Sequence, residues 1–467
     1  MSLRARLQLA NLAVALLLLG LTPYPHAFTE AMRRAEPHRA AREYGAALAA
    51  YQQAARLDPE SPLPWVRMGE TLLSQHRFLP AATAFREAER LGGDGAALLG
   101  LGESYSGRGD WAAAMLTWLH AQELAPYDAR LYVALGRGSI VQGRFDQAVE
   151  YLSQALLLQP ATEEATVAHT LLGYLLLDDD PARAVEHLRQ AGNDAMALWA
   201  MAVADAANAE SEPARRALLL GAAFLQQDET GLARREFERA IAVAPTDADA
   251  HAYLAHTLDR LGEPVAAEKL LQHALALNPD STLAYYFLGV HRRRLGNIEG
   301  AQAALWEAFR RDPENAALRV EMAEAFVDRG DYAHAEEWYR GAVEAAPENV
   351  EFHLLLVHFY LDHLYRIEAG GLPAAEAAVA LAPADPRVHD LLGWAYHLAG
   401  RQVEAVQALN QALQLEPDLV SAHFHLGSLY ATTGQRDLAR QHLQRAADLD
   451  TAGYYRDRAE SLLNDLK

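Results

Sequence analysis

The sequence predicts an all-α solenoid, in which paired helices stack one after another along the chain. Alanine and leucine dominate the 467 residues, and runs of alternating β-branched residues are scarce. Prolines also recur with a fixed period, because Pro245, Pro279, Pro313 and Pro347 follow one another at intervals of 34 residues. Such a period indicates a repeat architecture rather than separately cored domains.

Residues 1–27 are expected to form an N-terminal transmembrane anchor or signal segment. No formal charge occurs between Arg6 and Glu30, and the apolar run covers residues 7–24. As a helix this run would span roughly 27 Å, close to the hydrocarbon core of a bilayer. The two arginines before the run favour a cytoplasmic N-terminus and place the repeat body on the extracytoplasmic face, periplasmic or outer, of a single-pass membrane protein. Further arginines follow the run, so a cytoplasmic body stays open, and a cleaved signal peptide is the alternative to an anchor.

The rest of the chain is expected to be repeats. Two helical patterns lie between successive prolines, and each proline follows the second pattern, where it ends the helix. We expect a first array at 28–191, a junction helix at 192–213, a second array at 214–452 and a polar-faced cap helix at 453–467. The junction is predicted because "DAMALWAMAVADAANA" has no partner pattern before the next proline, and the cap because the end of a solenoid must face water.

Two local features depart from the regular repeat. In "DDDP", Asp180 is expected to cap the helix that follows by accepting a backbone N–H. The stretch "YRIEAGGLPAAEAA" carries a two-residue insertion with a glycine pair, and we expect altered curvature there.

Small and large residues recur at fixed offsets within each unit. The first helix holds a large residue, then Leu-Gly and an aromatic residue, and the second holds Ala, a large residue and Ala before the proline. Two units show the whole pattern: Leu98, Leu101, Gly102, Tyr105, Ala114, Trp118, Ala121 and Pro126, and His389, Leu392, Gly393, Tyr396, Ala405, Leu409, Ala412 and Pro417. This pattern resembles the tetratricopeptide repeat. The resemblance implies a right-handed superhelical solenoid of about twelve antiparallel helix pairs that binds other proteins.

Composition excludes several classes of function. The formal net charge is −21, with an acidic repeat body, whereas nucleic-acid binding requires a basic surface. The absence of cysteine excludes Cys-ligated zinc and a thiol nucleophile. No nucleophile elbow, phosphate loop or acid–base pair is legible, so we expect no catalytic residue, cofactor, metal or small-molecule substrate.

Histidines on one helix were considered as metal ligands. His353, His358 and His363 are five residues apart, so each step rotates about 140° around the helix and the three cannot converge. His353 and His389 occupy a packing position of the repeat and are expected to be partly buried.

The resemblance also implies where a partner binds, because the first helix of each unit lines the concave face in this family. The residues offset from the packing positions are therefore candidates, and exposed aromatics beside Arg and His are typical of protein-binding hot spots. The candidate partner-binding residues are Tyr286, Val290, Arg293, Leu354, His358, Leu361, Asp390, Trp394, His397, Phe424 and Ser428.

These observations predict a membrane-anchored, non-enzymatic scaffold that binds and positions other proteins. The expected partners are subunits or assembly intermediates of a membrane or bacterial envelope complex. One alternative is a soluble secreted or periplasmic adaptor released by signal cleavage. Another is a substrate-recognition subunit of an enzyme whose catalytic chain is separate.

Overall fold

The computed structural model describes residues 26–93, 95–158 and 162–466, and within these ranges the chain is helical and contains no strand. The predicted all-α fold is therefore confirmed. The predicted anchor or signal segment at 1–27 lies outside the described residues, except for His26 and Ala27, which begin the first described helix. Between residues 26 and 466, no helix combines the length and the apolar character that crossing a bilayer requires.

Close contacts divide the chain into two compact units, and the predicted junction at 192–213 lies inside the second. Unit 1 comprises the chain up to Pro126 together with Arg440–Lys467, and unit 2 comprises Tyr127–Ala439. The described helices of unit 1 are α2 (His26–Ala40), α3 (Tyr44–Leu57), α4 (Leu63–Ser74), α5 (Phe78–Arg90), α6 (Gly95–Ser106), α7 (Trp111–Leu124), most of α26 (Arg436–Leu449) and α27 (Tyr454–Asp465).

Unit 2 holds the remaining helices. They are α8 (Ala129–Val141), α9 (Phe145–Leu157), α10 (Thr162–Leu176), α11 (Pro181–Gln190), α12 (Ala195–Ala209), α13 (Pro213–Gln226), α14 (Thr230–Val243), α15 (Ala248–Arg260), α16 (Pro264–Leu277), α17 (Thr282–Arg294), α18 (Ile298–Arg311), α19 (Ala316–Asp328), α20 (Tyr332–Ala345), α21 (Val350–Asp362), the π-helix η1 (Ile367–Gly371), α22 (Leu372–Leu381), α23 (Pro386–Leu398), α24 (Gln402–Leu415) and α25 (Val420–Thr432).

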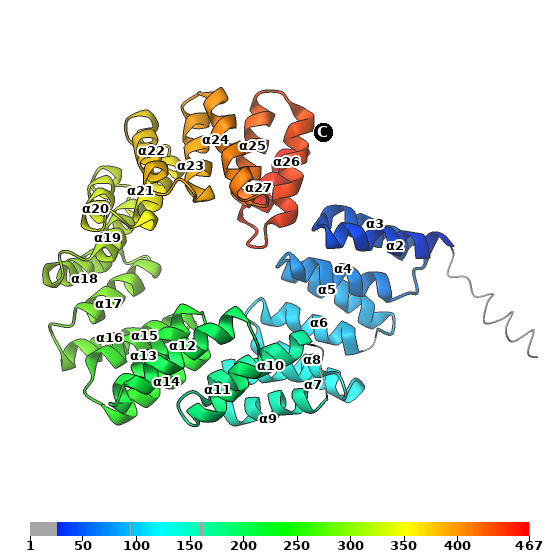
Figure 1. Cartoon of the computed structure of the whole chain (residues 1–467), viewed down its shortest axis with the longest axis horizontal. Helices are drawn as coiled ribbons and strands as arrows, with labels where there is room; N and C mark the ends of the chain where they lie inside the picture. The colour runs from blue at the N-terminus through cyan, green and yellow to red at the C-terminus, as the bar shows by residue number, and fades with distance from the viewer. Residues whose placement is uncertain (1–25, 94, 159–161, 467) are drawn as a thin grey trace, which may run out of the picture. The chain divides into compact units, whose positions relative to one another are not determined.

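Most helices pack in sequential antiparallel pairs within their own unit (Figure 1). The pairs are α2 with α3, α4 with α5, α6 with α7, α8 with α9, α10 with α11, α13 with α14, α15 with α16, α17 with α18, α19 with α20, α21 with α22 and α23 with α24. Here the first helix of a pair is called the first helix and the other the second helix.

The start of a first helix is set by a polar cap two residues after the repeat proline. Asp247, Ser281, Asn315 and Asp385 each occupy the N-cap position, and each side-chain oxygen accepts a backbone N–H of the first helical turn. These bonds satisfy amides that have no partner inside the helix. The predicted cap at the "DDDP" turn is likewise confirmed, because Asp180 Oδ1 accepts the N–H of Arg183 at 3.1 Å.

Glycine on the first helix allows the paired helices to approach closely. A Cβ placed on Gly393 would lie 2.6 Å from Leu409 Cγ, and one on Gly221 would lie 2.5 Å from the ring of Phe237. Both partners are fully buried on the second helix of the same pair. The Leu-Gly motif therefore exists because the large residue of the second helix fills the space that a side chain would occupy.

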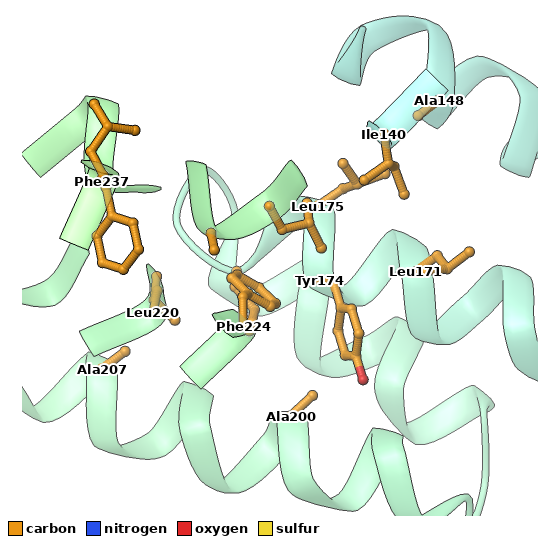
Figure 2. Close-up of a cluster of buried hydrophobic side chains, with 14 of the residues drawn as sticks. Ile140, Ala148, Leu171, Tyr174, Leu175, Ala200, Ala207, Leu220, Phe224 and Phe237 are labelled. Atoms are coloured by element: carbon orange, nitrogen blue, oxygen red, sulfur yellow. The ribbon is translucent and has the colours of Figure 1, made fainter. Parts of the chain in front are cut away.

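The helix α12 is present where an extra helix is predicted, and it has no antiparallel partner of its own among the pairs described above. It packs against α10, α11 and α13 through Ala197, Ala200, Ala204 and Ala207, all of which are buried. In Figure 2, Tyr174 of α10 and Phe224 of α13 lie beside Ala200 of α12, and the ring centres of Tyr174 and Phe224 are 5.5 Å apart. Small residues thus bring α12 close to two neighbours whose aromatic rings complete the core.

A long-range contact accompanies α12. Arg235 of α14 is 7% exposed, donates to the carbonyl of Leu175 at the end of α10, and lies over the ring of Phe145 at 4.8 Å. The adjoining Glu236 is fully buried and accepts from Arg235 Nε at 2.8 Å; burial raises the pKa of this carboxyl, while the neighbouring arginines oppose the rise. The bond from Arg235 to Leu175 therefore links α14 to α10, while Glu236, which also lies 3.5 Å from Arg239, balances the buried charge of Arg235.

The predicted insertion also has a defined structure. The π-helix η1 precedes α22, and a Cβ on Gly370 would lie 2.4 Å from the ring of Tyr360. Tyr360 OH donates to Glu336, and Arg366 forms an ion pair with the same carboxylate at 2.9 Å. Gly370 is therefore required for the close approach of η1 to α21.

Candidate protein-binding surface

All predicted partner-binding residues lie in unit 2, on the first helices α17, α21 and α23 and on α25, which follows the α23–α24 pair. We call the surface of these helices, together with that of α19 between them, the first-helix face. The structure divides the predicted residues into two groups. Leu354, Leu361, Asp390 and Phe424 are buried and belong to the packing between helices. Tyr286, Val290, Arg293, His358, Trp394, His397 and Ser428 keep part or most of their surface exposed.

On α17, Arg293 is surrounded by acidic side chains of α19. Its guanidinium lies 3.3 Å from Glu321, 3.5 Å from Glu324 and 3.3 Å from Asp328. Three carboxylates around one cation give this part of the face a net negative charge when all are ionised. Arg293 is therefore already paired and helps to position the acidic groups.

Burial raises the pKa values of two groups near Arg293. The pKa of Glu321 is raised because burial disfavours the charged carboxylate, although Arg293 opposes the effect. Burial also raises the pKa of Tyr286 to about 12, with Glu321 adding to the rise. Glu324 accepts the hydroxyl of Tyr339 from α20. We call Tyr286, Arg293, Glu321, Glu324 and Asp328 the acidic patch.

On α23 and α25, a second group of side chains forms around Trp394. The Trp394 ring stacks on His425 at a centroid distance of 4.4 Å and on His397 at 5.0 Å. Buried Asp390 holds His425 in place, because its carboxylate lies 2.8 Å from Nδ1 of that ring. Trp394 is thus a rigid, partly exposed aromatic surface of the kind that dominates binding energy at protein interfaces. We call Trp394, His397 and His425 the aromatic patch.

On α21, His358 is exposed and lies 3.5 Å from Asp362, one helical turn away. His353 instead places Nε2 2.9 Å from the carbonyl of Pro347, and His363 packs on the ring of Tyr332 at 4.9 Å. These three histidines, two on α21 and one at its C-cap, therefore have different partners, as the five-residue spacing predicts. Across the described part of the chain, no three His, Cys, Asp or Glu side chains are placed to hold a metal ion.

The histidines at the packing position have a shared structural role. Nε2 of His251, His353, His389 and His423 lies 2.8–3.0 Å from the carbonyl six residues earlier, which belongs to the repeat proline. Since a carbonyl can only accept, Nε2 carries the proton in each ring. The interpretation of His353 and His389 as packing groups is thereby extended to a hydrogen bond that ties the first helix to its preceding turn.

Sequence reasoning missed the acidic residues of α19 and the role of His425. Glu324 follows Val290 by 34 residues, so extending the register of the repeat by one unit would have found it. His425 gives no such signal, because its stacking on Trp394 depends on how α25 approaches α23.

Comparison with known proteins agrees with the repeat pattern. Models described as TPR repeat or tetratricopeptide repeat match residues 66–129, 129–162, 224–289, 286–350, 393–434 and 420–452, which together are more than half of the chain. No curated protein compared with the chain matches it significantly.

Several solved structures match the chain at low sequence identity. Yeast Tom70 is 17% identical, with 87% of this chain and 95% of that chain covered and a TM-score of 0.43. The crystal structure of the APC/C hetero-tetramer Cut9–Hcn1 contains a chain that is 14% identical, with 97% of this chain and 98% of that chain covered and a TM-score of 0.39. A repeat protein from Parabacteroides merdae is 13% identical, with 55% and 99% covered and a TM-score of 0.42. The sequence motifs, the helix pairs and the matching family models together show that the chain belongs to the tetratricopeptide repeat family.

Proposed function

We propose that the chain is a non-enzymatic scaffold that binds partner proteins along the first-helix face of unit 2. The observation that carries this proposal is the aromatic patch, where Trp394 stacks on two histidine rings and keeps part of its surface exposed. A side chain fixed in this way loses little conformational freedom when a partner covers it, so more of the contact energy contributes to affinity.

The acidic patch supplies the second contact in this proposal. Its carboxylates outnumber its one guanidinium, and the chain as a whole carries a net charge of −21. A partner segment with Lys or Arg complements this charge and is steered toward it at low salt. The scaffold would therefore bind a segment that combines basic and apolar residues.

Site-specific photo-cross-linking tests this assignment. A benzoyl-phenylalanine group at His358 is expected to cross-link a partner, whereas the same group at Val403, exposed on the second helix α24, is not. A Trp394→Ala substitution should reduce cross-linking from His358 about tenfold or more, in line with the loss of an interface hot spot. Equal cross-linking from Val403 would place the partner on the second helices instead.

We further propose that residues 7–24 anchor the scaffold in a membrane, with the repeats on the extracytoplasmic face, where they position subunits of a membrane complex. The uncharged apolar run of the sequence supports this. Intact mass and membrane fractionation test it. A mature protein that lacks the first residues and is found in the soluble fraction would favour a released adaptor, and catalytic turnover by the purified chain would contradict the scaffold.

A further inference from the structure

The C-terminal end of the chain contacts the first two helix pairs inside unit 1. Residues 440–466, here called the C-terminal hairpin, include most of α26 and all of α27. Gly45 N–H donates to Asp448 Oδ1 at 2.9 Å, and these two residues are separated by 403 positions in the sequence. Such a contact cannot follow from the repeat period, which relates only neighbouring units.

Two arginines of the hairpin bind helix C-termini. Arg445 Nη1 donates to the carbonyls of Ala41 at 3.1 Å and Arg42 at 3.4 Å, directly after the end of α2. Arg456 Nη1 donates at 2.8 Å to the carbonyl of Gln75, the C-cap residue of α4. The last carbonyls of a helix lack partners inside the helix and carry partial negative charge, so cationic donors are favoured at both places.

One carboxylate of the hairpin binds a helix N-terminus. Gly45 lies in the first turn of α3, where backbone amides lack partners and carry partial positive charge, and Asp448 accepts its N–H. Gln444 Nε2 lies 3.3 Å from the same carboxylate oxygen, and a Cβ on Gly45 would lie 2.9 Å from that nitrogen. The absence of a side chain at Gly45 therefore allows the hairpin to approach.

The contact is buried and its geometry is fixed in advance. Asp448 is 5%, Arg456 8% and Gln75 3% exposed. Asp450 accepts the backbone N–H groups of Tyr455 and Arg456, which sets the start of α27 and with it the position of the Arg456 side chain. A weaker ion pair joins Arg77 and Glu460 at 3.8 Å.

We propose that the ends of α2 and α4 and the start of α3 form a docking edge for a helical hairpin, and that the chain's own C-terminal hairpin occupies this edge as a reversible latch. The signs of charge match at all three helix termini. The named bonds of the latch lie at helix termini, so the latch can open without breaking a hydrogen bond inside α2, α3 or α4. This latch is separate from the first-helix face and does not depend on the function proposed above.

The latch can be tested with two spin labels, because the chain has no native cysteine. Gln52→Cys on α3 and Gln441→Cys on α26 replace exposed residues and leave the named contacts in place. Electron–electron distance measurements should give one narrow, short distance in the closed latch. Arg445→Met or Arg456→Met should raise the population of longer distances roughly tenfold, the effect of losing a charged hydrogen bond.

Matched variants separate the latch from general damage. Arg458→Met removes an exposed arginine of α27 that stacks on Tyr454, and it should leave the short distance unchanged. Asp448→Asn keeps an acceptor for the Gly45 amide and should stay closed, whereas Asp448→Leu should open. Arg445 lies on α26, so its variant leaves the cap of α27 intact, and unchanged far-UV circular dichroism would show that the helices persist.

Two results would overturn the proposal. One is a narrow, short distance that persists in both the Arg445→Met and Arg456→Met variants. The other is a short distance that disappears when doubly labelled protein is diluted with an excess of unlabelled protein, which would show that the contact joins two copies of the chain.

Discussion

Replacing Phe224 with alanine is expected to release α12 from its neighbours in unit 2. Phe224 is fully buried, and its ring centre lies 5.5 Å from that of Tyr174 on α10 and 6.4 Å from that of Trp199 on α12. Truncation of a buried Phe to Ala costs about 3–5 kcal/mol, from lost burial and from the cavity that remains. Because α12 has no paired helix to hold it, most of this loss should fall on α12 and on the end of α10.

Native-state hydrogen exchange is the appropriate measurement, since a repeat array need not unfold in one step and local opening energies are then the defined quantities. In the Phe224→Ala variant, the opening free energy that protects the amides of α12 from exchange should fall by about 3–5 kcal/mol. Where the wild-type opening free energy is smaller than this, protection should be lost completely. Phe224→Leu keeps most of the volume and should lose less than about 1.5 kcal/mol.

Phe237→Ala is the matched control, because Phe237 is equally buried but fills the space beside Gly221 within the α13–α14 pair. It should lower the protection of α13 and α14 by a similar amount and affect α12 less. The reasoning is refuted if α12 keeps wild-type protection in Phe224→Ala, or if both alanine variants expose α12 to the same extent.

Three further predictions concern single positions in unit 2. Leu364 has φ of 50° and is 67% exposed, so Leu364→Gly should relieve left-handed strain. After the entropic cost of the added glycine is subtracted, the free energy of unfolding should rise by roughly 0.5–1 kcal/mol. The midpoint of thermal unfolding should rise accordingly, and a lower midpoint would contradict this. Gly393→Ala should destabilise the α23–α24 pair by about 1–3 kcal/mol in urea unfolding, because the new Cβ would meet Leu409 at 2.6 Å, and an unchanged midpoint would show that the helices separate freely. Burial against the ring of Phe287 lowers the pKa of His256 to about 4, so the unfolded chain binds the proton more tightly than the folded chain does. The contribution of His256 to the free energy of unfolding should therefore be fully present above pH 6.5 and be lost between pH 6.5 and 4. His256→Gln should flatten this pH dependence in unfolding curves measured across that range.

Much of the fold was predictable because the sequence pattern of each repeat indicates the contacts within that repeat. The 34-residue proline period locates the helix pairs, a polar residue two places after the proline starts several first helices, and the Leu-Gly motif marks where the second helix packs. Each relation connects residues within one unit or its direct neighbour, so one sequence carries the information. The extra helix at α12 was predictable for the same reason, as a helical pattern without a partner pattern.

The candidate surface was predictable only in part. The register placed Tyr286, Arg293, His358, Trp394 and His397 on first helices, which is where they lie. The register could not distinguish these exposed residues from buried residues on the same side of a first helix, because exposure depends on how closely the next first helix approaches. The charge of the acidic patch was missed because Arg293 was considered without the carboxylates of α19 that neutralise it.

The sequence by itself thus determined the helices, their pairing and the family, since these depend on short-range patterns that repeat many times. Only the tertiary structure decided that Phe424 and Asp390 are packing groups, that Trp394 stacks on His425, and that Asp448 accepts the amide of Gly45. These facts depend on distances between helices that are not paired, or on residues hundreds of positions apart, and no period in the chain encodes them.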